Sequence, residues 1–386
     1  MLTDQPILFV LVLVAAIGIG WLLRGRFINH EPSAHNKGLS DEYFRGLNHL
    51  LNEEQDKALE VFMRMVEVDS DTVETHFALG SLFRRRGEVD RAIRIHQNLI
   101  ARPSLSRIHR QQALYELGED YMRAGLLDRA ENLFTELAQS GAFVGPALRH
   151  LMSIYEFQSD WDQAIGAAER LELVEGRSQQ RTISHYLCEL AELAHEGGQD
   201  KRAESLLKKA LSADAENIRA YMLTGHLAEQ EGDLKQAVKA YRRVIERDPG
   251  FAGEVLGLLQ ECFRKGGDDQ GMDTLLDELL RQMPATVPSV ALAALGRPDL
   301  AREGLDAFIK HYLESKGHAM DIAPAREIFG LLLEHHPRYL CRGCGLTANT
   351  LYWQCPSCRQ WGSVSPHLEL PGSPSASALP EGTGRR

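Results

Sequence analysis

The chain has 386 residues, of which 44% are hydrophobic and 25% are charged, and its formal net charge is -11. This length allows two or three domains or one long repeat array, and the composition is typical of a globular protein. A chain this acidic has no general electrostatic attraction to nucleic acid or to anionic lipid, so we expect no nucleic-acid partner.

The first predicted element is a membrane-spanning helix at the N-terminus. Residues 7–23 form an uncharged apolar run of 17 residues, at the short end of what crosses a bilayer as a helix. A cleaved signal peptide would begin with a basic segment, whereas here Asp4 precedes the run and Arg24 and Arg26 follow it. Because basic flanking residues stay on the cytoplasmic side, the bulk of the chain is predicted to be cytoplasmic, with the N-terminus outside. The predicted boundaries are 1–26 for the anchor and 27–38 for a polar juxtamembrane linker.

An array of helical hairpins is predicted next, from an alanine that recurs once per repeat. The separations are 34, 38, 34, 39 and 34 residues, between Ala58, Ala92, Ala130, Ala164, Ala203 and Ala237. A period of 34 residues is that of the tetratricopeptide repeat, a pair of antiparallel helices, and this portion resembles that family. The predicted fold class is therefore all-α, an α-solenoid in which each hairpin packs on its neighbours.

Small and large residues recur at fixed offsets from these alanines. Twelve residues earlier, where two helices would approach closely, lie Gly46, Gly80, Gly118 and Gly225. Four residues later, where a large side chain would fill the space between helices, lie Phe62, Phe134 and Tyr241. Turn glycines five residues before the alanine mark the loops at Gly87, Gly125, Gly198 and Gly232. The glycine is replaced by Met152 in the fourth repeat and by Ala191 in the fifth.

The array is expected to continue past the sixth repeat. A seventh repeat has Gly271 in the alanine position, a weaker eighth lies around Ala301, and a helix over 323–335 would cap the array. The predicted repeat domain spans residues 39–337.

The repeat family lines a groove with the first helix of each hairpin, through positions 2, 5, 9 and 12. Carried over to this chain, these positions predict a protein-binding groove that includes Phe77, Arg84, Tyr115, Met122, Arg149, Met222 and His226. Aromatic, methionine and arginine side chains suit recognition of a peptide or a protein. Any one of them taken singly is also compatible with an ordinary packed or solvated side chain.

Four of the six cysteines predict a metal site near the C-terminus. Cys341 and Cys344 form one C-x2-C pair, Cys355 and Cys358 form another, and ten residues separate the pairs. Each pair presents two thiolates from a tight turn, and two such turns complete a tetrahedron around one ion. Two disulfides would conflict with a cytoplasmic location. The remaining cysteines, Cys188 and Cys262, are predicted to be buried apolar residues.

The pattern C-x2-C-G … C-P-x-C resembles rubredoxin, which leaves zinc and iron as alternatives for the one ion. We favour zinc because the segment between the pairs is shorter than a rubredoxin needs. The predicted metal domain spans 338–366, and a disordered tail rich in Pro, Ser and Gly follows at 367–386.

The metal domain is too small to bury its own large apolar side chains. We expect it to dock Leu351, Trp353 and Trp361 on the last helix of the array. The partners predicted there, at helical spacing, are Ile328, Leu331 and Leu332.

The whole chain resembles the lipopolysaccharide assembly protein B family of Gram-negative bacteria. The most telling stretches are LNEEQDKALEVF at 51–62 and TLYWQCPSCRQW at 350–361. The resemblance implies a regulatory scaffold of the inner membrane, with its N-terminus in the periplasm. It implies as partners a membrane AAA protease and the deacetylase that commits flux to lipid A, whose degradation the scaffold promotes. It also implies association with lipopolysaccharide assembly proteins of the inner membrane.

Three functions are compatible with these features. The first is the adaptor implied by the resemblance, the second is an electron-transfer or redox-sensing protein with a rubredoxin-like iron centre, and the third is a general peptide-binding co-chaperone. Common nucleotide-binding and hydrolase motifs are absent from the sequence, so we do not expect an enzyme.

Overall fold

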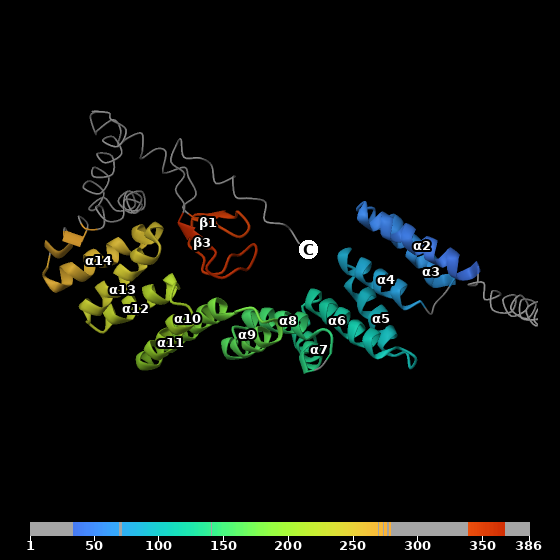
Figure 1. Cartoon of the computed structure of the whole chain (residues 1–386), viewed down its shortest axis with the longest axis horizontal. Coiled ribbons are helices and arrows are strands. Elements are labelled where there is room, and N and C mark those ends of the chain that lie inside the picture. The colour runs from blue at the N-terminus through green and yellow to red at the C-terminus, as the bar shows by residue number, and fades with distance from the viewer. Residues whose placement is uncertain are drawn as a thin grey trace, which may run out of the picture. The chain divides into compact units, whose positions relative to one another are not determined.

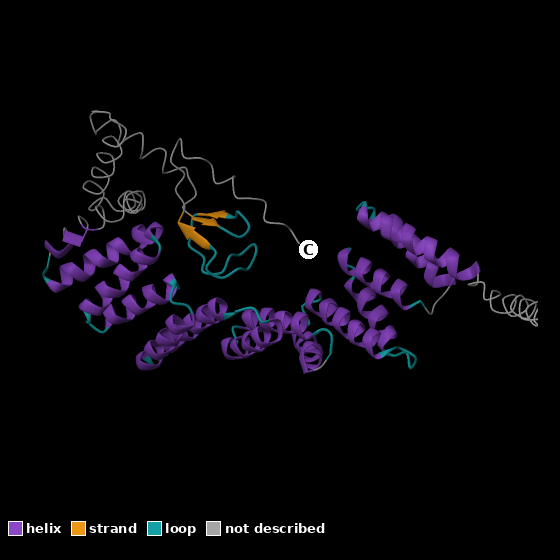
Figure 2. Ribbon diagram, viewed as in Figure 1, coloured by secondary structure: helices purple, strands orange, loops and turns teal. Residues whose placement is uncertain are grey.

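The computed structural model describes residues 34–68, 72–139, 141–268, several residues between 270 and 278, and 339–366. Figure 1 shows a succession of helices and a small stranded domain, and Figure 2 shows that the strands described lie in that domain alone. The chain divides into two compact parts, Met1–Ile154 and Tyr155–Arg386, referred to below as the N-terminal part and the C-terminal part.

The described helices of the N-terminal part pair as antiparallel hairpins in chain order. The hairpins are α2 (Ala34–Leu51) with α3 (Gln55–Val68), α4 (Val73–Arg85) with α5 (Val89–Ile100), and α6 (Arg107–Arg123) with α7 (Leu127–Gln139). Helix α2 begins at Ala34, inside the stretch predicted as a linker. The repeated alanines of these hairpins, Ala58, Ala92 and Ala130, are fully buried, as their periodicity predicts.

Helix α8 (Val144–Gln158) runs into the C-terminal part, where the array continues. It comprises α9 (Trp161–Glu175), α10 (Gln180–Glu196), α11 (Asp200–Ala213), α12 (Ile218–Gln230), α13 (Leu234–Arg247), the short 3-10 helix η1 (Pro249–Phe251) and α14 (Ala252–Gly266). Local chemistry sets several helix starts: the side chains of Asp160, Asn217 and Asp233 each accept a hydrogen bond from the backbone N–H three residues on. The chain therefore folds as the predicted array of tetratricopeptide hairpins over its described helices.

Close contacts inside the hairpins explain the glycine pattern. A methyl group added at Gly46, Gly118 or Gly225 would come within 2.4–2.7 Å of the ring of Phe62, Phe134 or Tyr241, respectively, so only glycine fits without displacement. Each ring is fully buried. The predicted small-against-aromatic pairing is confirmed in these three repeats.

The second repeat has a histidine at the position that Phe62, Phe134 and Tyr241 occupy in the first, third and sixth repeats. His96 lies four residues after Ala92, and its ring approaches the added methyl position at Gly80 to 2.4 Å. Its Nδ1 lies 2.5 Å from a carboxylate oxygen of Asp120, and both side chains are fully buried. Arg84 donates to the other oxygen of Asp120 at 2.7 Å, so the buried carboxylate is paired on both sides.

The stranded domain, referred to below as the ribbon, is a three-stranded antiparallel sheet. Its strands are β1 (Tyr339–Cys341), β2 (Thr347–Ala348) and β3 (Val364–Pro366), in the order β2-β1-β3. A small core of Tyr339, Val364, Cys341 and Cys355, with Cys358 packed against it, holds it together. Such a core is too small for independent stability, which is why a metal ion is expected in domains of this size.

Within the described residues, no helix has both the length and the apolar character needed to cross a bilayer. The predicted anchor, most of the predicted linker, the eighth repeat, the capping helix and the C-terminal tail lie outside the described residues.

Candidate functional site

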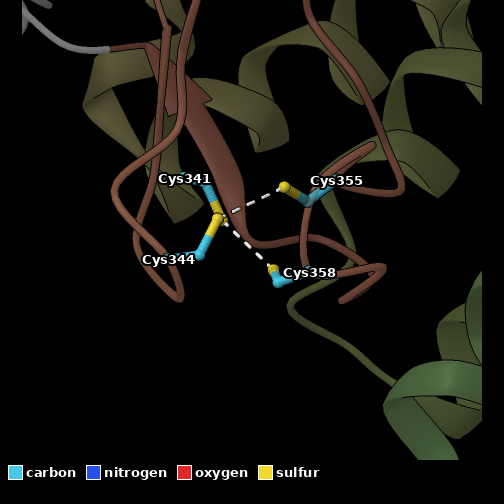
Figure 3. A group of neighbouring side chains, drawn as sticks. All are labelled: Cys341, Cys344, Cys355 and Cys358. Atoms are coloured by element: carbon cyan, nitrogen blue, oxygen red, sulfur yellow. Dashed lines mark hydrogen bonds between the residues drawn. The ribbon is translucent and has the colours of Figure 1, made fainter. Parts of the chain in front are cut away.

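Four sulfur atoms converge in the ribbon. Cys341, Cys344, Cys355 and Cys358 offer ligand atoms that all lie within 4.8 Å of one another, and Figure 3 shows their side chains pointing toward a common point. The Sγ atoms of Cys341 and Cys358 are 3.7 Å apart, as are those of Cys344 and Cys355. Zinc–sulfur bonds of about 2.3 Å place tetrahedral sulfurs ~3.8 Å apart, so the donor set fits one tetrahedral ion.

The two C-x2-C turns have matching backbones. The N–H of Gly345 donates to the carbonyl of Cys341, and the N–H of Arg359 donates to the carbonyl of Cys355 in the same way. Gly345 has φ 77° and Arg359 has φ 59°, so each turn ends in a left-handed residue. Glycine adopts this conformation freely, whereas an arginine is held there at a cost. Gly345 therefore closes its turn without strain.

Crowding of the thiols gives them unequal acidities. Burial raises the pKa of Cys341, but the Ser363 hydroxyl and two backbone amides outweigh it and lower that pKa to about 6. The Gln360 amide favours the Cys358 thiolate, but burial and the neighbouring thiols raise its pKa to about 12. Four thiolates can share this space only around a cation, which is the condition that a metal ion satisfies. The four cysteines therefore form a metal-binding site of the zinc-ribbon type.

The ribbon docks on the helices of the C-terminal part through the carboxylate of Glu156. Trp361 Nε1 donates to Glu156 Oε1 at 2.9 Å, and Gln354 Nε2 donates to Oε2 at 3.0 Å. The Tyr186 hydroxyl of helix α10 also donates to Oε1, at 2.6 Å. The Trp361 ring stacks on His185 and lies edge-on to Tyr186. Together with the hydrogen bonds to Glu156, these ring contacts hold the ribbon against helices α8 and α10.

Trp353 makes a second anchor several residues away. Its ring lies parallel to Phe251, with centroids 6.2 Å apart, and the Arg219 guanidinium lies 6.0 Å from its centroid. Trp353 and Leu351 pack against the buried cluster formed by α12, α13 and α14. The two tryptophans and Leu351 therefore pack their apolar side chains against the array, because the ribbon is too small to bury them by itself.

Polar contacts complete the interface. The Tyr339 hydroxyl donates to Glu254 at 2.6 Å, and Arg342 donates to Asp248 at 3.2 Å. Here the ribbon supplies the donors, whereas Arg181 of the array donates to the Gly362 carbonyl of the ribbon at 2.7 Å.

Docking through Leu351, Trp353 and Trp361 matches the prediction, but the described contacts are made with other helices. The partners Ile328, Leu331 and Leu332 lie outside the described residues. Sequence reasoning missed Glu156, His185 and Arg219 as contact residues. The signal that could have found them is the numbering of positions within each repeat. With Met152, Ala191 and Gly225 at position 8, they fall at the groove positions 12, 2 and 2 of repeats four, five and six.

The predicted groove residues of the N-terminal part lie in varied surroundings. Phe77 is buried, and Arg84 is half-buried between Glu116, Glu119 and Asp120. Tyr115 stacks on Phe143, and its hydroxyl lies 2.9 Å from His150. Burial and Glu119 raise the Tyr115 pKa to about 12. Met122 is half-buried and Arg149 is exposed.

The predicted groove residues of the C-terminal part are Met222 and His226. Met222 is half-buried against the same cluster as Trp353. His226 is exposed, and its Nε2 lies 2.9 Å from Gln230. The structure places the predicted groove residues on the first helices of their repeats.

Taken together, these features define a tetratricopeptide-repeat protein that packs a four-cysteine metal ribbon against its own helices. Residues 339–366 match the family model described as the rubredoxin metal binding domain, and residues 75–108 and 218–251 match tetratricopeptide repeat models.

Two curated relatives, both named lipopolysaccharide assembly protein B, resemble the chain over nearly its full length. The one from Escherichia coli K12 is 37% identical, over 95% of this chain and 99% of the relative. The one from Haemophilus influenzae is 31% identical, over 93% and 98%. The chain belongs to the lipopolysaccharide assembly protein B family. A crystal structure of MamA protein is also similar, at 23% identity and a TM-score of 0.33, over 47% of this chain and 95% of that one.

Proposed function

We propose that this protein is a non-enzymatic scaffold of the inner membrane that regulates lipopolysaccharide biosynthesis. In this proposal the N-terminal helix anchors the chain and the repeats face the cytoplasm. The repeats present the lipid A-committing deacetylase to a membrane AAA protease and so promote its degradation, and the scaffold also assists lipopolysaccharide assembly. The observation that carries the proposal is the family membership, which extends over 95% of the chain to a relative named lipopolysaccharide assembly protein B.

The arrangement of the described surfaces supports the N-terminal part as the client-binding part. In the C-terminal part, inner positions of repeats four to six hold the ribbon, through residues such as Glu156 and His185. In the N-terminal part, a cavity of about 300 Å3 is lined by apolar side chains, including Leu47 and Phe77, together with Arg85, His109 and Glu74. A mixed apolar and charged lining suits a peptide segment with apolar and polar side chains.

Site-directed crosslinking in membranes tests this proposal. A photo-crosslinking residue at Ser81, in the wall of that cavity, is expected to capture the deacetylase in the full-length protein. The same residue at Leu173, which is 84% exposed and lies elsewhere, is the matched control and should not capture it. Equal capture at both positions, or capture of the deacetylase at neither, would contradict the proposal.

The proposed topology has its own test. A reporter active only in the periplasm, fused after Arg386, should remain silent because the C-terminus is proposed to be cytoplasmic. Removing residues 1–23 should release the protein from the membrane and abolish regulation, because tethering raises its effective concentration near membrane-bound partners. Reporter activity, or full regulation by the untethered protein, would contradict the topology.

A second candidate is electron transfer, which the match to the rubredoxin metal binding domain favours. The two candidates differ in the metal: the scaffold is proposed to hold one structural zinc ion, whereas a redox protein would hold iron. Elemental analysis of the protein from its native host should find one zinc per chain and a colourless sample. Stoichiometric iron with a red colour would support the redox candidate instead.

A further inference from the structure

A cavity of about 500 Å3 lies between the ribbon and helices α10 to α13, and none of the four cysteines lines it. The array contributes Arg181, His185 and Arg247 to its wall, and the ribbon contributes Arg342 and Trp353. This volume is within the usual range for small-molecule sites. Neither the scaffold role nor the metal accounts for a cavity lined by three arginines and a histidine.

His185 is the feature of this wall that indicates a ligand. Its side chain is 3% exposed, yet its Nδ1 has no hydrogen-bond partner within the described part of the chain. Buried polar atoms are rarely left unpaired, so His185 keeps an unused hydrogen-bonding nitrogen beside the cavity, which a bound molecule reaches once the ring turns. Stacking on Trp361 fixes the plane of the ring.

Two guanidinium groups, those of Arg219 and Arg181, act on His185. Burial, together with the charges of Arg219 and Arg181, lowers the His185 pKa to about 3. The imidazole is therefore neutral at physiological pH and can donate one N–H to an anion. An anion in the cavity would also offset the charges that disfavour imidazolium.

Two of the arginines are held only by exposed ion pairs. Arg247 pairs with Glu216, which is 64% exposed, and Arg342, itself 68% exposed, pairs with Asp248. Exposed pairs contribute little, so both guanidinium groups can turn to a ligand at low cost.

The acidic groups of the wall are Asp214, Glu216 and Asp248. Two of them already accept backbone hydrogen bonds: Asp214 from the N–H of Glu216, and Asp248 from that of Gly250. They are therefore partly satisfied within their own turns, and Glu216 can turn to solvent when Arg247 leaves it.

We propose that this cavity binds a phosphate monoester carried by a small molecule. Arg181, Arg247 and Arg342 surround the phosphate, because guanidinium matches phosphate geometry and charge, and His185 donates its N–H to a phosphate oxygen. Since the ligand touches both the array and the ribbon, its binding fastens the ribbon in place. This inference does not depend on the identity of the protein client.

Calorimetry on the full-length protein in detergent tests the proposal, with glucose 6-phosphate, inorganic phosphate and short-chain phosphatidic acid as probes and glucose as the neutral control. We expect saturable binding of one phosphate probe per chain and none of glucose. Arg247→Gln and Arg342→Gln should each weaken binding about tenfold, because each removes a charged hydrogen-bond donor. Arg243→Gln is the matched control: Arg243 lies on the same helix, pairs with Glu246 and is not part of the cavity wall.

The choice of probe distinguishes the source of the phosphate. Binding of glucose 6-phosphate or inorganic phosphate supports a soluble ligand, and binding of phosphatidic acid alone supports a lipid headgroup. Hydrogen exchange over residues 339–366 should slow when the probe is bound. The proposal is overturned if no phosphate probe saturates, if glucose binds equally well, if Arg243→Gln weakens binding as much as the two wall variants, or if exchange in the ribbon is unchanged at saturation.

Discussion

Glu156 connects three segments of the C-terminal part through one carboxylate. It accepts hydrogen bonds from Trp361 and Gln354 of the ribbon and from Tyr186 of α10. Burial, the nearby charge of Glu156 and this hydrogen bond all raise the pKa of Tyr186, so its hydroxyl stays protonated as a donor. Hydrogen bonds to an ionised acceptor are stronger than neutral ones, which makes this side chain the principal polar contact of the interface.

Glu156→Leu should loosen the ribbon without affecting the metal ligands. The change leaves the indole N–H and the tyrosine hydroxyl without their acceptor, and we expect a loss of about 2–4 kcal/mol in the free energy of docking. Hydrogen exchange over 339–366 measures it. Glu156→Gln should cost less, because the Gln354 amide can turn to face the new amide. Glu169→Leu, at an exposed site of α9, is the control, and equal exchange in all variants would refute the role of Glu156.

His185 should make the C-terminal part less stable in mild acid. Burial, helped by Arg219 and Arg181, lowers its pKa from 6.5 to about 3. Between these values the unfolded chain binds a proton that the folded chain does not, so the free energy of unfolding falls as the pH falls through this window.

Between pH 5.5 and 4.5 the wild type should lose about 1 kcal/mol more stability than His185→Gln. Urea unfolding followed by tryptophan fluorescence measures the difference, since Trp161, Trp353 and Trp361 all lie in the C-terminal part. Acid release of the metal affects both proteins alike. Equal pH slopes would show that His185 does not remain neutral in the folded protein.

At the scale of the hairpin, stability depends on how closely two helices approach. A methyl group at Gly225 would lie 2.4 Å from the Tyr241 ring, which is fully buried and has no room to move aside. Overpacking of this kind typically costs about 1–3 kcal/mol. The fifth repeat has a different solution, in which Ala191 and Leu207 share one buried cluster with no aromatic ring.

Gly225→Ala should therefore destabilise the protein by about 1–3 kcal/mol. Gly166→Ala is the matched control: Gly166 lies inside α9, and an added methyl group would meet no atom within 4 Å. There alanine should stabilise by up to about 1 kcal/mol through its higher helix propensity. Thermal unfolding compares the two, and a shift of the same sign in both would mean that the contact with Tyr241 does not govern the effect.

At the scale of the whole molecule, the metal should stabilise helices that it does not touch. The ion orders the turns that carry Trp353 and Trp361, and these side chains pack on Phe251, His185 and Tyr186 of the array. Because ligation is coupled to folding, losing the ion should undock the ribbon and expose this surface.

In Cys358→Ser, hydrogen exchange should accelerate over the ribbon and over residues 180–230. Exchange in α4 and α5 should stay unchanged, because in a repeat array each hairpin depends mainly on its neighbours. Unchanged protection over 180–230 would show that the ribbon behaves as an independent domain, and faster exchange throughout the array would show a general loss of folding.

The sequence by itself determined the features that arise from local spacing. The repeated alanines follow one another at the length of one repeat. The glycine–aromatic pairs, such as Gly225 with Tyr241, and the turns at Cys341 and Cys355 depend on residues closer than that. Helix periodicity and ligand spacing act over that range, so the hairpins and the metal site could be predicted.

Only the tertiary structure decided where the ribbon docks. Gln354 and Trp361 reach Glu156 across 198 and 205 residues of sequence. Their positions within the repeats place Glu156, His185 and Arg219 among the groove-lining residues, but they do not indicate which surface covers them. That choice depends on how the repeats stack, which brings Glu156 to Trp361 and Phe251 to Trp353. The same stacking creates the arginine-lined cavity, whose residues come from distant segments and form no motif in the sequence.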